Sequence, residues 1–181
     1  MPEPVQRRLA AILAADVVGY SRLMGKDEEG TLAALTAHRA ELIEPCIDDH
    51  RGRVAKTTGD GMRAEFASVV DAVRCALAFQ NGMRDRNADA LEDSRIEFRI
   101  GVNLGDVIVQ EDDVYGDGVN VAARLEGLAE PGGIYISSGV FDHVEGKIDA
   151  ECEDLGEREL KNIARPVRVY KLRIGTPKSW L

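Results

Sequence analysis

A short hairpin pattern constrains the fold of this chain more than any other feature of its sequence. Residues 52–55 predict a strand, and residues 62–66 alternate between apolar and charged side chains, as expected for a strand with one buried face. Between them, Gly59-Asp60-Gly61 predicts a tight turn, because glycine reaches the backbone angles that such turns require. An aspartate in a turn usually serves the turn itself, so Asp60 alone is a weak candidate for chemistry.

A second aspartate has a similar setting. Asp16 follows the apolar run 9–15, which predicts a buried strand ending in a loop that contains Gly19-Tyr20-Ser21. Backbone N–H groups in such loops favour phosphate oxygens. Asp16 and Asp60 together could bind hard cations such as Mg²⁺ and serve phosphoryl chemistry. The pattern is equally consistent with a helix-capping Asp16 and a turn-forming Asp60.

The composition indicates a soluble globular domain and argues against a nucleic-acid-binding protein. The chain has 181 residues, of which 44% are hydrophobic and 30% are charged, as expected for one soluble globular domain. The net charge of −9 argues against nucleic acid as a partner. A small anionic substrate remains compatible with this charge, because a bound divalent metal would offset it.

The sequence also bears on location and redox state. It has no apolar run long enough to span a membrane and no signal peptide, so we expect a cytoplasmic chain without membrane contact. Cys46, Cys75 and Cys152 are widely spaced and odd in number, which predicts reduced thiols. The first two fall in apolar helical patterns, and we expect them in the core.

The expected elements follow the order strand, helix, hairpin, helix, strand pair, helix, then smaller strands. Pro45 predicts a kink in the first helix. This order indicates an α+β sandwich with a mainly antiparallel sheet and a ferredoxin-like, split βαβ core. The expected ranges are helices near 27–50, 68–87 and 119–128, a strand pair 96–102 and 107–109 around a turn at 104–106, and late strands 134–136, 155–160 and 167–172.

Two further residue pairs suggest nucleotide chemistry. Asn120 and Arg124 are four residues apart on a predicted helix, so they share a face suited to a sugar and a phosphate. The alternative is an ordinary polar face, with Arg124 paired to Glu126 or Glu130. Lys56 and Asp113 would match an adenine edge, because lysine donates to N1 and aspartate accepts from the amine. Their alternatives are a solvated lysine and a turn aspartate.

Three segments together resemble the catalytic domain of class III adenylate/guanylate cyclases: 15–21 (ADVVGYS), 56–61 (KTTGDG) and 113–124 (DVYGDGVNVAAR). The resemblance extends from about Arg8 to Leu172. Each motif alone would be weak, but three in the right order make the resemblance specific. It implies a catalytic domain over residues 1–174 and a C-terminal exit segment over 175–181.

The resemblance also implies roles for individual residues and a homodimer. One chain would supply the metal-binding aspartates, and the other would supply the lysine, the base-reading aspartate, the asparagine and the arginine, so two copies would form two complete sites. Asp16, Asp60 and the Val17 carbonyl would bind two Mg²⁺ or Mn²⁺ ions per site, and Lys56 and Asp113 would select adenine. Asn120 and Arg124 would contact the transition state. The phosphates would be bound by Gly19, Tyr20 and Ser21, with a further polyphosphate contact from Lys161.

The activity implied is cyclisation of ATP to 3′,5′-cyclic AMP and pyrophosphate. One alternative is cyclisation of GTP, which the Lys56–Asp113 pair disfavours. Another is a catalytically silent module for dimerisation or sensing, which has no need to keep metal ligands. An RNA-binding sheet is a fourth possibility, disfavoured by the acidic charge and by the aromatic content of 5%.

Overall fold

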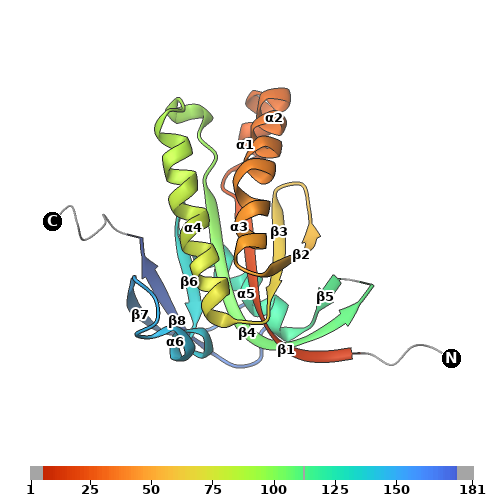
Figure 1. Cartoon of the computed structure of the whole chain (residues 1–181), viewed down its shortest axis with the longest axis vertical. Coiled ribbons are helices and arrows are strands. Elements are labelled where there is room, and N and C mark those ends of the chain that lie inside the picture. The colour runs from red at the N-terminus through yellow and green to blue at the C-terminus, as the bar shows by residue number, and fades with distance from the viewer. Residues whose placement is uncertain (1–5, 112, 175–181) are drawn as a thin grey trace.

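Eight strands form a single mixed sheet in the computed structural model, which describes residues 6–111 and 113–174 (Figure 1). The strand order is β2-β3-β1-β4-β6-β8-β7, with β5 paired to β4. Only the β4–β6 pairing is parallel among the pairings described. The strands are β1 (Gln6–Val17), β2 (Gly52–Thr57), β3 (Gly61–Phe66), β4 (Phe98–Gln110), β5 (Asp113–Tyr115), β6 (Ile134–Ser137), β7 (Glu151–Arg158) and β8 (Val167–Arg173).

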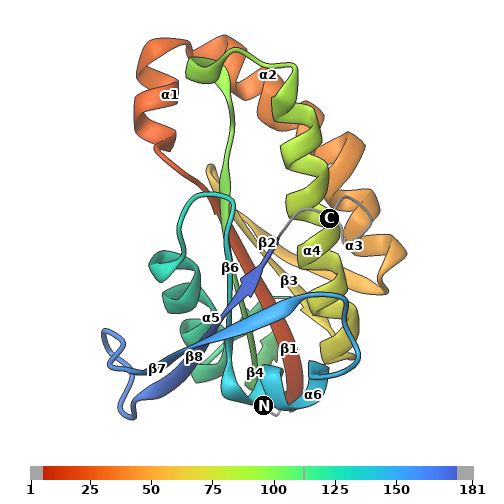
Figure 2. The same ribbon diagram turned by 90° about the vertical axis from the view of Figure 1, so that its left-hand side faces the viewer.

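Helices cover both faces of this sheet, as Figure 2 shows for α5 on one side and α3 and α4 on the other. This arrangement confirms the predicted α+β class with a mainly antiparallel sheet. The exit segment predicted over 175–181 lies outside the described residues. The helices are α1 (Tyr20–Lys26), α2 (Glu28–His38), α3 (Glu44–Asp49), α4 (Val69–Ala88), α5 (Asp117–Leu128) and α6 (Ser138–Val144), with a π-helical turn over Arg39–Ile43 and a 3₁₀ turn over Glu92–Ser94.

The central strand β1 is buried on both faces, which explains its continuous apolar run. Ala11, Leu13 and Ala15 belong to the core shared with α3 and α4. The alternate residues Ala10, Ile12 and Ala14 pack in the core beneath α5. Because side chains alternate along a strand, Asp16 continues the α5 face.

Strand β4 differs from the sequence prediction. We expected two strands, 96–102 and 107–109, around a turn at 104–106, and this is wrong: β4 runs unbroken and pairs with β1 throughout. Gly105 serves close packing rather than a turn. A Cβ atom on it would lie 2.9 Å from the Cα of Gly118 in the first turn of α5.

The first helical region begins earlier than the sequence predicts, because α1 forms over Tyr20–Lys26 where a loop was expected, and the predicted start at Asp27 is the start of α2. Asp27 caps α2 by accepting a hydrogen bond from the Gly30 N–H at 3.0 Å. Pro45 lies in the first turn of α3, and the π-helical turn precedes it directly. Proline has no N–H to continue the regular helical ladder, so the irregularity falls on the preceding turn. No helix among the described residues is long and apolar enough to cross a membrane.

Candidate active site

The strand end and the hairpin tip meet at one pocket. Asp16 of β1 pairs in register with Gly61 of β3, and the Val17 N–H donates to the Asp60 carbonyl at 2.8 Å. Asp16 and Asp60 line the same pocket, with a volume of about 150 Å³, between the hairpin and α5. The structure therefore brings together the two aspartates that the sequence singled out.

A third carboxyl group, Glu126 of α5, lines the pocket with them. Burial and the nearby Asp16 carboxylate raise the pKa of Glu126 to about 8. Burial also raises the pKa of Asp16, although its hydrogen bond with Glu126 and the charge of Arg99 oppose that shift. The two carboxyl groups share a hydrogen bond, and burial together with the Asp16 charge favours the protonated form of Glu126.

The sequence had suggested Glu126 or Glu130 only as an ion-pair partner of Arg124, and that interpretation is wrong. The Arg124 guanidinium donates from Nε to the Lys161 carbonyl at 3.0 Å, so two predicted site residues lie together. Glu130 instead forms a 2.9 Å ion pair with Lys171. Both Arg124 and Lys161 are exposed.

Two charged side chains in the pocket region leave buried atoms without partners. Asp16 Oδ1 and Arg99 Nε are buried and make no hydrogen bond within the described part of the chain. Arg99 lies opposite Asp16 in the β1–β4 register. Unsatisfied buried atoms of this kind are costly unless a ligand completes them. The carboxylate oxygens of Asp16 and Asp60, which line the same pocket, fit a hard cation such as Mg²⁺ or Mn²⁺.

The predicted adenine-reading pair is also assembled. Lys56 Nζ of β2 lies 4.0 Å from Asp113 Oδ2 of β5, and the Lys56 side chain is 45% exposed. The other Asp113 oxygen accepts a hydrogen bond from the Val114 N–H at 2.7 Å, which fixes the carboxylate locally. Because the contact between Lys56 and Asp113 is long and the lysine is exposed, both side chains can still form hydrogen bonds to a ligand.

The remaining predicted residues occupy two places. Asn120 is exposed on α5, and neither it nor Arg124 nor Lys161 lines the aspartate pocket. Gly19 adopts a left-handed conformation (φ 63°) at the start of α1, followed by Tyr20 and Ser21 in its first turn. This junction stands beside the hairpin, because a Cβ on Gly59 would lie 3.5 Å from the Tyr20 hydroxyl. The phosphate-binding role of the junction and the metal-binding role of the Val17 carbonyl stay predictions.

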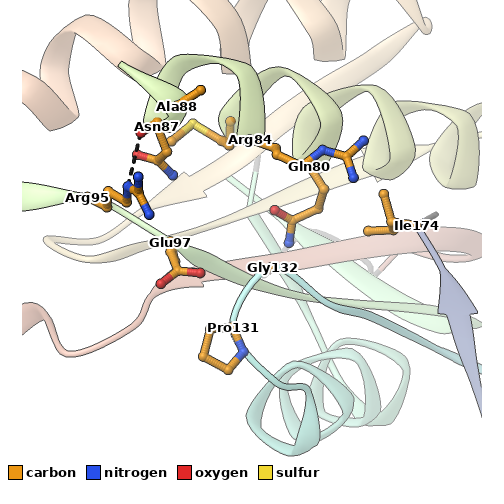
Figure 3. Close-up of a pocket in the computed structure, with 10 residues that line it drawn as sticks. Gln80, Arg84, Asn87, Ala88, Arg95, Glu97, Pro131, Gly132 and Ile174 are labelled. Carbon is orange, nitrogen blue, oxygen red and sulfur yellow. Dashed lines mark hydrogen bonds between the residues drawn. The ribbon is translucent and has the colours of Figure 1, made fainter. Parts of the chain in front are cut away.

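A larger pocket, with a volume of about 430 Å³, lies elsewhere between α4 and the 131–132 turn (Figure 3). None of the predicted site residues lines it. Its buried Gln80 donates to the carbonyls of Phe98 and Gly133, at 2.9 and 3.0 Å. This amide holds α4 against the sheet, which gives it a structural function. Size alone therefore does not identify the active site.

Sequence comparison gives the class of protein. The profile of the "Adenylate and Guanylate cyclase catalytic domain" family matches residues 5–174. The chain belongs to this family and is a nucleotide cyclase catalytic domain.

Individual relatives support this assignment. The chain is 54% identical over 168 residues to the protein named "Putative adenylate cyclase 3" of Rhizobium meliloti, covering 93% of this chain and 29% of that protein. The crystal structure of an adenylate/guanylate cyclase/hydrolase from Silicibacter pomeroyi matches with a TM-score of 0.88 and 46% identity, covering 93% and 98% of the two chains. The adenylyl cyclase CyaB of P. aeruginosa shares the fold, with a TM-score of 0.83 at 23% identity over 97% and 98%.

Proposed function

We propose that this domain is an adenylate cyclase that converts ATP to 3′,5′-cyclic AMP and pyrophosphate. The observation that carries the proposal is the convergence of Asp16 and Asp60 on one pocket, where Asp16 Oδ1 is buried without a partner. A pocket lined by carboxylate oxygens can bind metal ions, so it suits metal-assisted phosphoryl transfer better than attack by a protein nucleophile.

Asp16, Asp60 and the Val17 carbonyl would bind two Mg²⁺ or Mn²⁺ ions. Bound there, such ions lower the pKa of a ribose 3′-hydroxyl and offset the charge of a triphosphate. Glu126 would hold Asp16 in place from the α5 side, through the hydrogen bond between the two carboxyl groups.

Lys56 and Asp113 support ATP as the substrate. Adenine presents an acceptor at N1 and a donor at its exocyclic amine, whereas guanine presents a donor at N1 and an acceptor at O6. Lysine donates and aspartate accepts, so the 4.0 Å pair matches adenine at both positions. Guanine would place a donor against a donor and an acceptor against an acceptor.

The exposed residues of α5 suggest that the site is shared between two chains. Asn120 would orient the ribose and Arg124 would stabilise charge on the α-phosphate, while Lys161 and the backbone of 19–21 bind the outer phosphates. Because Asn120, Arg124 and Lys161 do not line the aspartate pocket of their own chain, a second copy would present them. A homodimer would then have two complete sites.

The test is cyclic AMP formation from ATP with Mg²⁺ or Mn²⁺ over a range of protein concentrations, with GTP in parallel. We expect ATP turnover to rise faster than linearly with protein concentration, as half-sites pair, and GTP to be a poor substrate. Turnover of GTP in preference to ATP would overturn the assignment of substrate. Absence of product from a folded, dimeric protein would instead indicate a catalytically silent module.

A further inference from the structure

A second cluster of ligand side chains lies on the other side of the sheet, between α3 and α4. Cys46 Sγ is 3.7 Å from Cys75 Sγ and 3.9 Å from His50 Nδ1. The three ligand atoms all lie within 4.8 Å of one another. Cys46 and His50 are four residues apart at the end of α3, so they share one helix face. Cys75 comes from α4.

These spacings match the geometry of a soft-metal site. Zinc binds sulfur at about 2.3 Å and histidine nitrogen at about 2.0–2.1 Å with tetrahedral angles, which places two sulfurs about 3.8 Å apart and a sulfur and a nitrogen about 3.6 Å apart. The observed 3.7 and 3.9 Å are within a few tenths of an ångström of both values. Two of the three distances between ligand atoms therefore already fit such a site, and the third, between Cys75 and His50, is within 4.8 Å.

We propose that Cys46, His50 and Cys75 form a binding site for a soft divalent cation of the Zn²⁺ type. Two thiolates and an imidazole prefer such an ion to Mg²⁺, which takes oxygen ligands. Two thiolates would also neutralise its charge in a place where Cys46 and Cys75 are 7% and 0% exposed. Three protein ligands leave a fourth position for water.

The two thiols interact directly in the structure, with Cys75 donating a hydrogen bond to the Cys46 sulfur at 3.7 Å. A hydrogen bond from Cys75 lowers the pKa of Cys46 to about 7, against the opposing effect of burial, and the nearby His50 adds to the shift. The same contact and burial raise the pKa of Cys75. Metal binding would replace the hydrogen bond between the two sulfurs and release the thiol protons.

To bind a metal at Nδ1, His50 must give up a hydrogen bond to the backbone. Its Nδ1 lies 2.7 Å from the Cys46 carbonyl oxygen, so metal binding at Nδ1 must replace that hydrogen bond. His143 makes the same contact with the carbonyl four residues earlier, Gly139, at 2.8 Å, but belongs to no such cluster among the described residues. It therefore offers a matched control for His50, as Cys152 does for the two cysteines.

The test is titration of the reduced protein with Co²⁺ under anaerobic conditions, followed by displacement with Zn²⁺. We expect thiolate-to-cobalt charge-transfer absorption that saturates at one equivalent, is abolished by Zn²⁺ and is unaffected by Mg²⁺. Cys46→Ser and Cys75→Ala should each remove the absorption. His50→Gln should weaken Co²⁺ binding by about tenfold, whereas Cys152→Ser and His143→Gln should leave it unchanged.

Several results would overturn the proposal. One is the absence of charge-transfer absorption in folded protein whose thiols are shown to be reduced. Another is absorption that survives in the Cys46→Ser/Cys75→Ala double variant or disappears in Cys152→Ser. Formation of a Cys46–Cys75 disulfide with no metal uptake by the reduced pair would assign these residues to thiol chemistry instead. Circular dichroism of each variant verifies the fold, and Zn²⁺ should raise the melting temperature of the wild type only if the site exists.

Discussion

The carboxylate pocket and the thiol–imidazole cluster each bring together three titratable side chains from segments far apart in the sequence, yet they differ in how well those side chains are satisfied. In the pocket, burial raises the pKa values of both Asp16 and Glu126, the Asp16 carboxylate raises that of Glu126 further, and Asp16 Oδ1 has no hydrogen-bond partner among the described residues. In the cluster, Cys46 donates to the Cys75 carbonyl and Cys75 donates to the Cys46 sulfur.

The pocket is therefore costly to the fold without a bound ligand, whereas the thiol cluster is not. An unsatisfied buried carboxylate is destabilising until something binds it, so the pocket is an arrangement that function explains better than stability does. Buried thiols behave as small apolar side chains and cost little without a ligand. The cluster can therefore belong to an ordinary core and still accept a metal.

The largest expected effect comes from disabling the carboxylate pocket and then measuring both ATP turnover and Co²⁺ binding by the thiol cluster. Asp60→Asn removes a ligand charge while keeping the side chain's shape, so we expect a loss of ATP turnover of about 10²–10³-fold. Binding of Co²⁺ by the thiol cluster should not change. The control is Asp93→Asn, which neutralises a surface carboxylate that is 80% exposed and paired with Lys26. Full turnover in the Asp60 variant would refute the role given to the pocket.

The choice between ATP and GTP tests the proposed base-reading pair independently of the two proposed metal sites. In Lys56→Glu/Asp113→Ser, the first position accepts from guanine N1–H and the second donates to O6. We expect kcat/KM for ATP to fall by about 10–100-fold and the ATP-to-GTP ratio to shift toward GTP. Turnover assays with both nucleotides provide the measurement. An unchanged ratio would mean that the 4.0 Å pair is only a surface contact.

A smaller effect is expected at Glu126. Glu126→Ala leaves Asp16 without its hydrogen-bond donor, and we expect kcat to fall by about tenfold. Glu126→Gln keeps a donor at that position and should retain most of the turnover. The two variants, compared at saturating metal and ATP, distinguish positioning of Asp16 from simple removal of charge. Equal losses in both would show that the carboxyl group itself is required.

The smallest expected effect is on stability and concerns Glu65, whose carboxylate is paired with two arginines. Burial disfavours ionisation of Glu65, but hydrogen bonds from Arg8 and Arg53, at 2.7 and 2.9 Å, outweigh it and lower its pKa below 4.5. This stabilisation is present above pH 4.5 and is lost as the pH falls through the lowered pKa. Because both arginines are partly exposed, we expect Glu65→Gln to reduce the free energy of unfolding by about 1–2 kcal/mol at pH 7. Urea denaturation at pH 7 and pH 4 measures this loss, which should shrink at the lower pH.

The sequence predicted features that depend on local patterns. The hairpin, the helices near 27–50 and 68–87 and the apolar run of β1 follow from turn chemistry and periodicity, and three motifs located Asp16, Asp60, Lys56 and Asp113. Glu126 and Arg99 were missed because their contacts depend on the β1–β4 register and on the packing of α5 against the second face of the sheet. Arg99 had one local signal, a charge between the apolar residues Phe98 and Ile100.

The error in β4 has a similar origin. Gly105 in an otherwise regular strand pattern looked like a turn, although the residue it must accommodate, Gly118, is thirteen positions away in the sequence. The cysteine cluster was likewise invisible from spacing, because Cys46 and Cys75 were predicted as core residues without any sign that they face each other. Long-range contacts of this kind need the tertiary structure.

The position of Asp16 has a consequence for motion in the pocket. It ends the strand whose alternate residues are buried in both cores, so its backbone should be among the last to exchange amide hydrogens with solvent. Asp60 lies in a hairpin turn whose neighbours Thr58 and Gly59 are exposed, where opening costs less. One proposed metal ligand therefore lies on the most persistent part of the fold, while the other lies on an exposed turn held by Arg39, which donates to the Thr58 and Gly59 carbonyls at 3.1 and 3.0 Å. Entry and exit of ligands would follow the fluctuations of the hairpin, at a rate set by local rather than global unfolding.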